Sequence, residues 1–463
     1  MKRRTLICWL LCLALFAIPG FAFDDDDVKL LLRVAPQNLQ AILDKFDLEV
    51  EDAFPEQNLY LVEWEGGDDN DDSDDDDDDD DDDDSESLDR FLQRVRRDPR
   101  VLAIEVNQEL ELREDDDNPL VAPNANPASQ ALVDRQLVPF HGTQALKGYV
   151  EQPAAHRIEV DEVRSLASGA GIVAIIDTGV DTRHPLLRDR LLPGFDFTRN
   201  QPVADEIMDL NGQDGGVLTQ EAAVFLESLR PTNISSYATP ILTQEAAVFL
   251  EGARPPSAFG HGTMVAGLVR FTAPDAWILP VKAFDANGKA TLFNLVRSIY
   301  YSASKGARVI NMSFTLAQPS AEFTRAIHDV TMQGVVCVAA SGNDGLQTMV
   351  YPAGFPTVIG VASTNANDQR SAFSNFGPQL VTLAAPGEGL ITTYPGGYAA
   401  AWGTSFSTPL VAGAVALMEQ LRPGTTVDQA IGALSQAKPI GDAGLGFGRL
   451  DVSKALAGRL VQP

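Results

Sequence analysis

Cysteine is scarce in this chain of 463 residues, which contains Cys8, Cys12 and Cys337. The first two lie in an apolar amino-terminal segment, so a chain that lost this segment would keep one thiol and could form no internal disulfide. A disulfide-stapled scaffold is therefore excluded. The folded part must be held by a hydrophobic core, and a chain of this length can bury a large one beside a smaller module.

Basic residues are also few, with 35 Lys and Arg against 65 Asp and Glu and a formal net charge of -30. Residues 24–27 and the fifteen aspartates within 68–84 supply nineteen of the negative charges. The remainder, about -11, is an ordinary acidic surface. No basic patch is available for a nucleic acid, so this class of partner is excluded.

The amino terminus has the pattern of a secretory signal peptide. Basic residues at 2–4 precede an apolar run over 6–18, and small residues end the segment at Ala22. Residues 1–22 are therefore predicted to be removed, and the product to be exported to a periplasm, a cell surface or the medium. A retained membrane anchor is the weaker alternative because the run is short for a bilayer span. No stable membrane span is expected after signal removal.

Residues 23–112 have a periodicity of their own. They predict strands over 30–34, 59–64 and 101–106 and helices over 38–46 and 88–97, which indicates a small α+β module with antiparallel strands. The aspartate run at 68–84 interrupts it as a solvated loop, because adjacent like charges repel and nothing apolar is present to bury. Calcium would suit these carboxylates, but the run lacks the spacing of a calcium loop. No metal site is assigned.

Residues 113–127 are acidic and rich in Asn and Pro, which is typical of an exposed linker that a peptidase can cut. From 128 to 463, strand-like and helical runs alternate, which predicts a doubly wound, mostly parallel sheet with helices on both faces. The expected strands are 171–176, 277–281, 308–312, 335–339, 357–361 and 380–384. A duplicated segment, 218–227 and again 242–251, marks an insertion at about 200–258.

Four short motifs carry reactive side chains. Asp177 ends a strand in Asp-Thr-Gly, His261 opens a helix in Gly-His-Gly-Thr, Asn343 lies in a Gly-Asn turn, and Ser405 lies in Gly-Thr-Ser before an apolar helix. Parallel sheets place their sites at the carboxyl ends of their strands, where such residues can meet. Each motif alone also has a structural explanation, such as a turn or a helix cap.

These motifs also occur in other classes of protein or have other interpretations. Asp-Thr-Gly also occurs in aspartic peptidases, but their mechanism needs two carboxylates, so the single copy here leaves only a homodimer. His184 is the nearest rival to His261, and Ser405 or Ser407 could simply cap its helix. An α/β-hydrolase is excluded because Ser405 lacks the Gly-x-Ser-x-Gly elbow of that fold.

In this order, the four motifs resemble those of the subtilisin-like serine peptidases, also called subtilases or peptidase family S8. The resemblance covers residues 128–458 and implies a serine-type endopeptidase acting on proteins or peptides without a required cofactor. It implies that Ser405 is the nucleophile, His261 the general base, Asp177 the residue that orients His261, and Asn343 the oxyanion-hole donor. The alternative is a catalytically inactive, acidic surface-binding protein on the same scaffold.

The resemblance also suggests the substrate-binding residues and the role of the small module. Ser313, Phe314, Ser341 and Gly342 match positions that border the substrate. The family usually continues with two glycines where this chain has Thr315-Leu316, which is expected to narrow the pocket. Residues 23–112 resemble the family's inhibitory propeptide, a ferredoxin-like module, so the chain's own propeptide is an expected intramolecular partner.

Overall fold

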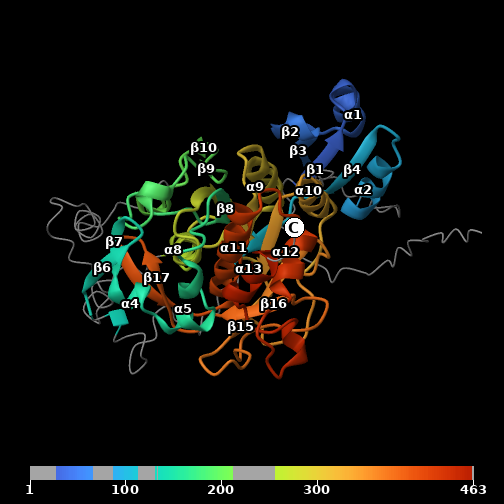
Figure 1. The fold of residues 1–463 in the computed structure, drawn as a ribbon. Coiled ribbons are helices and arrows are strands. Elements are labelled where there is room, and N and C mark those ends of the chain that lie inside the picture. Colours follow the sequence, from blue (N-terminus) through green and yellow to red (C-terminus); the bar gives the residue numbers. More distant parts are fainter. Residues whose placement is uncertain (1–27, 66–86, 113–130, 133, 212–255, 461–463) are drawn as a thin grey trace, which may run out of the picture. The chain divides into compact units, whose positions relative to one another are not determined.

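The computed structural model describes residues 28–65, 87–112, 131–132, 134–211 and 256–460 (Figure 1). The chain divides into two compact units, Met1–Val106 and Asn107–Pro463. The predicted signal peptide, the aspartate run, the linker and both copies of the repeat lie outside the described residues.

The first unit is a four-stranded antiparallel sheet with two helices, and its strand order is β2-β3-β1-β4. Its elements are β1 (Val28–Val34), α1 (Leu39–Phe46), β2 (Glu49–Phe54), β3 (Leu59–Trp64), α2 (Leu88–Arg96) and β4 (Val101–Val106). The core lies between sheet and helices and includes Leu30, Leu32, Val62 and Phe91. The predicted elements of this region are present. The unpredicted β2 is an edge strand with an acidic, exposed surface that gives no apolar alternation.

The second unit is built on an eight-stranded sheet with the order β10-β9-β11-β8-β13-β14-β15-β16. Every neighbouring pair is parallel except β9 and β10. The predicted parallel sheet is therefore confirmed. Its strands are β8 (Ile172–Asp177), β9 (Phe195–Asp196), β10 (Gln201–Pro202), β11 (Trp277–Lys282), β13 (Val309–Met312), β14 (Val336–Ala340), β15 (Val358–Thr364) and β16 (Leu383–Pro386).

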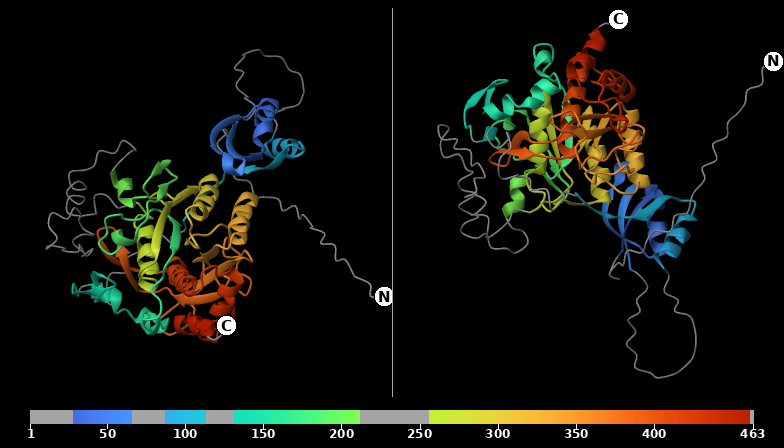
Figure 2. Two further views of the ribbon diagram at one scale, coloured as in Figure 1. Left: turned by 45° about the horizontal axis from the view of Figure 1, so that its top comes forward. Right: turned by 90° about the horizontal axis from the view of Figure 1, so that it is seen from below.

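Helices cover both faces of this sheet (Figures 1 and 2). On one face, α11 (Thr404–Leu421) packs against β13, β14, β15 and β16 and against α8 (His261–Thr272). Val173, Val309 and Val338 point into this core, while the alternate residues of the same strands, such as Ala174 and Ile310, are buried outside it. They meet the second pair of helices, α9 (Leu292–Ser304) and α10 (Ala321–Met332), on the other face.

Shorter elements complete the second unit. Three antiparallel pairs are formed by β5 (Glu109–Glu111) with β12 (Lys289–Thr291), β6 (Leu137–Phe140) with β7 (Thr143–Leu146), and β17 (Leu390–Tyr394) with β18 (Gly397–Ala401). The remaining helices are α4 (Lys147–Val150), α5 (Pro153–Arg157), α12 (Val427–Leu434), α13 (Val452–Leu460) and several 3₁₀ turns, of which η5 (Glu206–Asn211) matters below.

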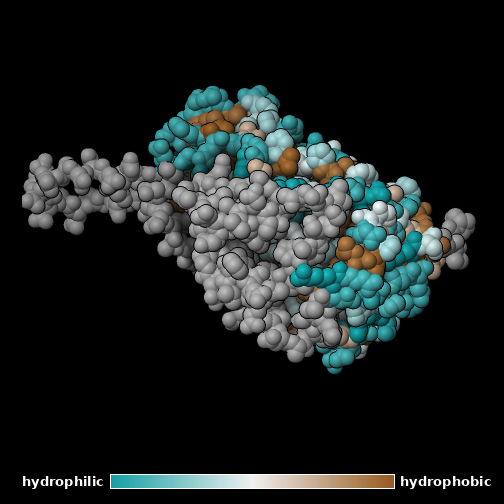
Figure 3. Space-filling view, turned by 90° about the vertical axis from the view of Figure 1, so that its left-hand side faces the viewer, coloured by the Kyte–Doolittle hydropathy of each residue, from teal (hydrophilic) through white to brown (hydrophobic). Residues whose placement is uncertain are grey.

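The surface of the described residues is mostly polar. Large exposed apolar side chains, such as Leu102, Trp277 and Met332, are far apart in sequence, and hydrophobic surface forms small patches in the view of Figure 3. Within the described ranges, no helix combines the length and the apolar character that crossing a bilayer requires.

Candidate active site

Asp177 and His261 form a buried pair. Asp177 is the last residue of β8, His261 is the first residue of α8, and their side chains are each about 1% exposed. The Nδ1 atom of His261 lies 2.7 Å from Oδ1 of Asp177, and the backbone N–H of Thr178 donates to the same oxygen at 2.8 Å. A Cβ on Gly262 would lie 2.0 Å from the carbonyl oxygen of Gly179. Glycine is therefore what lets the helix start so close to the strand end.

Ser405 lies in the first turn of α11, not at its cap. The N-cap is Gly403, whose φ of 143° suits glycine, and Ser405 is the second helical residue. The hydroxyl of Ser407 donates to the carbonyls of Ala385 and Pro386, both at 3.1 Å. The interpretation of either serine as a helix cap is thus wrong. In the first turn, the backbone N–H of Ser405 belongs to the donors that the helix itself does not use.

A proline fixes the position of Ser405. Pro409 lies inside α11 and has no N–H, so the carbonyl of Ser405, four residues earlier, lacks its usual helical donor. The hydroxyl of Ser313 takes this place and donates to the Ser405 carbonyl at 2.7 Å. In return, the Ser405 hydroxyl donates to the Ser313 carbonyl at 3.2 Å, and the Asn311 amide donates to the Ser313 hydroxyl at 3.0 Å. Ser313 is thus hydrogen-bonded to Ser405 in both directions.

The side chain of Asn343 is held in one orientation. Its Oδ1 atom accepts hydrogen bonds from the backbone N–H of Thr404 at 3.0 Å and from the Thr404 hydroxyl at 2.9 Å. Because the backbone N–H can only donate, the amide oxygen must face Thr404 and the Nδ2 group must point away from it. Asn343 therefore presents a donor beside the first turn of α11.

One small pocket, of about 30 Å³, brings most of the predicted site residues together. Its lining includes Ser313, Phe314, Gly342, Asn343 and Ser405. The ring of Phe406, next to Ser405, lies 5.4 Å from the imidazole of His261, which places the Asp177–His261 pair beside this pocket.

Ser341 and the Thr315-Leu316 pair differ in how they lie relative to this pocket. Ser341 does not belong to the lining of this pocket, because its buried hydroxyl donates to the carbonyl of Asn375 at 3.2 Å. Thr315 is part of the lining, whereas Leu316 pairs through its backbone with Tyr351. Of the two residues that replace the usual glycines, Thr315 is therefore the one positioned to narrow the pocket.

Leu112 is a member of this pocket that the sequence analysis missed. It follows β5, is 9% exposed, and lines the pocket beside Ser405 and Asn343. Its backbone N–H donates to the carbonyl of Gly288 at 2.7 Å, which extends the β5–β12 pairing toward the site. The alternating Glu-Leu-Glu-Leu sequence from Glu109 signals a strand, but nothing local indicates its partner.

His184 and Cys337 have structural surroundings. The Nε2 atom of His184 lies 2.8 Å from the carbonyl of Gly397, and its Nδ1 accepts from the backbone N–H of Leu186 at 3.2 Å. Burial lowers the pKa of His184, which keeps the ring neutral in this role. The thiol of Cys337 is buried in β14, and burial raises its pKa to about 12. His184 is thus no rival to His261.

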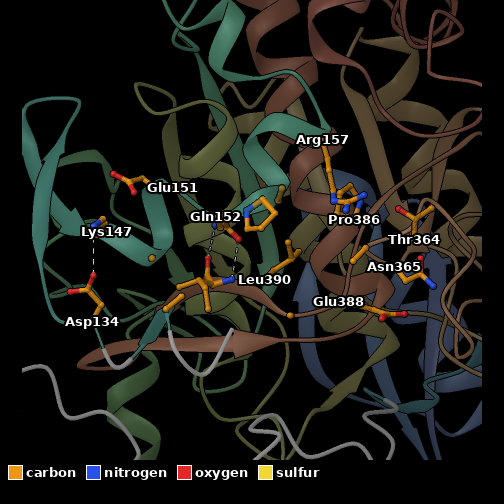
Figure 4. Close-up of a pocket in the computed structure, with 17 residues that line it drawn as sticks. Asp134, Lys147, Glu151, Gln152, Arg157, Thr364, Asn365, Pro386, Glu388 and Leu390 are labelled. Carbon is orange, nitrogen blue, oxygen red and sulfur yellow. Dashed lines mark hydrogen bonds and ion pairs between the residues drawn. The ribbon is translucent and has the colours of Figure 1, made fainter. Parts of the chain in front are cut away.

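A larger pocket, of about 610 Å³, contains none of the predicted catalytic residues (Figure 4). Gln152 bridges its wall, since its amide exchanges hydrogen bonds with the backbone of Ile391 at 2.8 and 3.0 Å. Lys147 and Asp134 lie 3.7 Å apart as an ion pair. Among the described residues, no group of three or more His, Cys, Asp or Glu side chains is arranged to hold a metal ion.

Comparisons with known proteins identify the family of the chain. The model of the subtilase family matches residues 169–448. Subtilisin BL from Lederbergia lenta is 31% identical over 284 residues, which cover 59% of this chain and 83% of that protein. Thermitase from Thermoactinomyces vulgaris is 32% identical over 283 residues, which cover 60% of this chain and 86% of that protein.

The crystal structure of fervidolysin from Fervidobacterium pennivorans, described as a keratinolytic enzyme related to subtilisin, has a TM-score of 0.65 and 19% identity. The match covers 95% of this chain and 62% of that chain, and at this identity it supports the fold alone. Fold and relatives together define a serine endopeptidase. The chain belongs to the subtilase family, which confirms the resemblance and the subtilisin-like fold expected from its motifs.

Proposed function

We propose that Ser405 is the nucleophile of this endopeptidase, with His261 as its general base and Asp177 as the residue that orients and stabilises the imidazole. The observation that carries the proposal is the buried 2.7 Å contact between His261 Nδ1 and Asp177 Oδ1. It leaves Nε2 of His261 as the atom that takes the Ser405 proton and later gives it to the leaving amine.

The same arrangement supplies the oxyanion hole. When Ser405 Oγ attacks the carbonyl carbon of the scissile bond, negative charge develops on the carbonyl oxygen. The Nδ2 group of Asn343 and the backbone N–H of Ser405 are the two donors assigned to it. Thr404 holds the Asn343 amide from its other side, so this donor needs no reorientation during the reaction.

A fluorophosphonate probe tests this proposal, because it labels only a serine that has been activated as a nucleophile. Wild-type protein whose linker has been cut is expected to gain one probe adduct on Ser405, and Ser405→Ala cut in the same way is expected to gain none. If folded, cut wild-type protein stays unlabelled, the chain is instead the inactive, acidic surface-binding protein on a subtilisin-like scaffold. Label that appears equally on the alanine variant would assign the nucleophile elsewhere.

We further propose that the chain is made as a self-inhibited precursor in which residues 23–112 are the propeptide. Leu112 supports this, because it lines the pocket that also contains Ser405 and Asn343. The β5–β12 pairing aligns the preceding residues as an added strand, the mode in which extended peptides bind a sheet edge. The scissile bond of self-processing is then the one between Leu112 and Arg113, at the start of the linker.

A charged residue at position 112 tests this arrangement. Leu112→Asp is expected to slow self-processing at least about 100-fold, because the pocket would have to desolvate a carboxylate. Leu102→Asp is the matched control, because Leu102 is 59% exposed and should process like the wild type. Intact-mass spectrometry after refolding follows the appearance of a fragment that begins at Arg113. Unchanged cleavage in Leu112→Asp, or cleavage in Ser405→Ala, would contradict the proposal.

Export completes the proposed function. The signal pattern of residues 1–22 supports removal after Ala22 and a product that works outside the cytoplasm on proteins or peptides. No cofactor is assigned, and the acidic run is not proposed as a calcium site. The mass measurement on secreted protein also reports whether the propeptide begins at Phe23, and a retained segment of residues 1–22 would refute this part.

A further inference from the structure

Glu206 is a buried carboxyl group behind the Asp177–His261 pair. It begins η5 and is 0% exposed. Its Oε1 atom accepts from the Thr178 hydroxyl at 2.5 Å and from the backbone N–H of Gly260 at 2.7 Å. Its Oε2 atom accepts from the hydroxyl of Thr263 at 2.5 Å and from the Thr263 backbone N–H at 3.3 Å. The carboxylate thus receives four donors, as many as its lone pairs allow.

These donors come from both sides of the catalytic pair. Thr178 follows Asp177 at the end of β8, while Gly260 precedes His261 and Thr263 lies in the first turn of α8. The backbone N–H of Gly262 also donates to the Thr178 hydroxyl at 3.0 Å, which closes a ring of hydrogen bonds between strand and helix. A carboxylate at residue 206 therefore ties together the two segments that carry Asp177 and His261.

We propose that Glu206 is a positioning residue for the Asp177–His261 pair and that its ionised form is the one that supports catalysis. The inference rests on the proposed function of that pair.

Burial makes Glu206 sensitive to pH near neutrality, and neighbouring charges modify this effect. The titratable groups nearby are Asp177 on β8, His261 on α8, Lys282 on β11 and Tyr394 on β17. Burial raises the pKa of Glu206 to about 7, although hydrogen bonds from Thr178 and Thr263 and the charge of Lys282 oppose the rise. Lys282 does not neutralise it directly, because its ammonium binds Asp209 at 2.9 Å and the carbonyls of Thr178 and Phe284.

Protonation of Glu206 would change the hydrogen bonds of Asp177. The Thr178 hydroxyl oxygen lies 2.5 Å from Glu206 Oε1 and 3.3 Å from Asp177 Oδ1, so it can donate to either. A protonated Glu206 must donate its own proton, and the Thr178 oxygen is a near acceptor. The Thr178 hydroxyl then turns to Asp177 Oδ1, the oxygen that His261 uses. A further donor weakens that oxygen as a partner for the imidazolium.

The sign of the pH effect follows from the raised pKa. Glu206 is mostly protonated below about pH 7 and ionised above it, so its contribution to activity is lost as the pH falls through 7. Its contribution to folding runs the other way. It is fully present below the ordinary value of 4.5 and is lost as the pH rises through about 7. The protein with an ionised Glu206 is therefore the catalytically useful form, although its fold is the less stable of the two.

The test is the pH profile of Glu206→Gln in the enzyme that is made as the full-length chain and then processes itself. We expect kcat at pH 8 to fall about tenfold with little change in KM, which corresponds to one charge-assisted hydrogen bond. In the wild type, Glu206 must also lose its proton for full activity, so log kcat/KM should fall with a slope clearly above 1 just below pH 7, until the tenfold loss is complete. In Glu206→Gln this steeper region should be absent and the slope should not exceed 1, because position 206 no longer titrates.

Asp205→Asn is the matched control. Asp205 is the neighbouring carboxyl group and also accepts from a threonine hydroxyl and a backbone N–H, those of Thr182 and Ile207. These donors do not belong to the segments next to Asp177 and His261 that Glu206 binds. This variant should keep the steeper region of the wild-type profile below pH 7 and a kcat within about threefold of the wild type. If Glu206 had a merely structural role, the pH profile of Glu206→Gln would have the same slope as that of the wild type. That result would overturn the proposal, and so would a variant in which only KM rises.

A second pair of variants decides the matter if Glu206→Gln does not fold. Thr178→Val removes the shared hydroxyl and should show the same reduced kcat and the same slope of no more than 1 as Glu206→Gln. Thr178→Ser keeps the hydroxyl and should have the kcat and the pH profile of the wild type. Equal profiles for these two variants would contradict the inference. Rates are expressed per site labelled by the fluorophosphonate probe. Wild-type protein that does not label would refute the proposed function itself, which separates the two failures.

Discussion

Replacing Ser405 by alanine is expected to lower kcat by roughly six orders of magnitude, the size of the corresponding loss in subtilisin. The alanine variant has no oxygen to attack the substrate, so His261 has no proton to accept and only the oxyanion donors and substrate binding remain. The fold should persist, because the variant loses one hydrogen bond, that of the Ser405 hydroxyl to Ser313, worth about 1 kcal/mol.

The measurement is hydrolysis of a chromogenic peptide, after an added and then inhibited peptidase has cut the linker of both chains. Ser407→Ala is the matched control, since its hydroxyl lies in the same helical turn but bonds the carbonyls of Ala385 and Pro386. It should lose about 1 kcal/mol of stability and keep kcat within about threefold of the wild type. An alanine variant at 405 that retains more than about 1% of kcat would show that the nucleophile is another group.

Asp177→Asn is expected to lower kcat by roughly four orders of magnitude, the loss measured for this change in another Asp-His-Ser enzyme. The amide can still accept at Oδ1 from His261 and from Thr178, but it carries no negative charge. When His261 takes the Ser405 proton, the resulting imidazolium then lies in a buried site without its counter-ion. The transition state loses this stabilisation, whereas substrate binding and KM should change little.

The control for Asp177→Asn is the same change at Asp181. Asp181 is also buried, and its carboxylate accepts backbone N–H donors from Arg183 and Gly396, both at 3.0 Å. Asp181→Asn should destabilise the fold by about 1–3 kcal/mol, because one N–H would face an amide group. Its kcat should nevertheless stay within about threefold of the wild type. Similar losses of kcat in the two variants would refute a special role for Asp177.

The larger part of the fold could be predicted from the sequence because its strands are buried on both faces. Such strands are short, continuous apolar runs, and helical patterns between them specify parallel pairing. The 171–176 run became β8 and the 335–339 run became β14, each displaced by one residue. Residues at the ends of these strands could be predicted to meet, because parallel strands end at one edge of the sheet.

The elements that escaped prediction depend on distant partners. β2 is an exposed acidic edge strand, and β5 has three residues whose pairing with β12 spans about 180 positions. Glu206 lies in a short 3₁₀ helix without a motif, and its burial is visible only after strand, helix and loop have come together. Leu112 was missed for the same reason, since a leucine near a linker has no local mark of an active-site residue.

The proline within α11 restricts how the substrate preference of this enzyme can be redesigned. Because Pro409 cannot donate, the backbone of Ser405 relies on Ser313, and Ser313 begins the segment that continues along the pocket as Phe314 and Thr315. A substitution that shifts this segment will also shift Ser405. Libraries aimed at new cleavage preferences should therefore vary Thr315 while conserving Ser313 and Pro409, so that selectivity can change without loss of turnover.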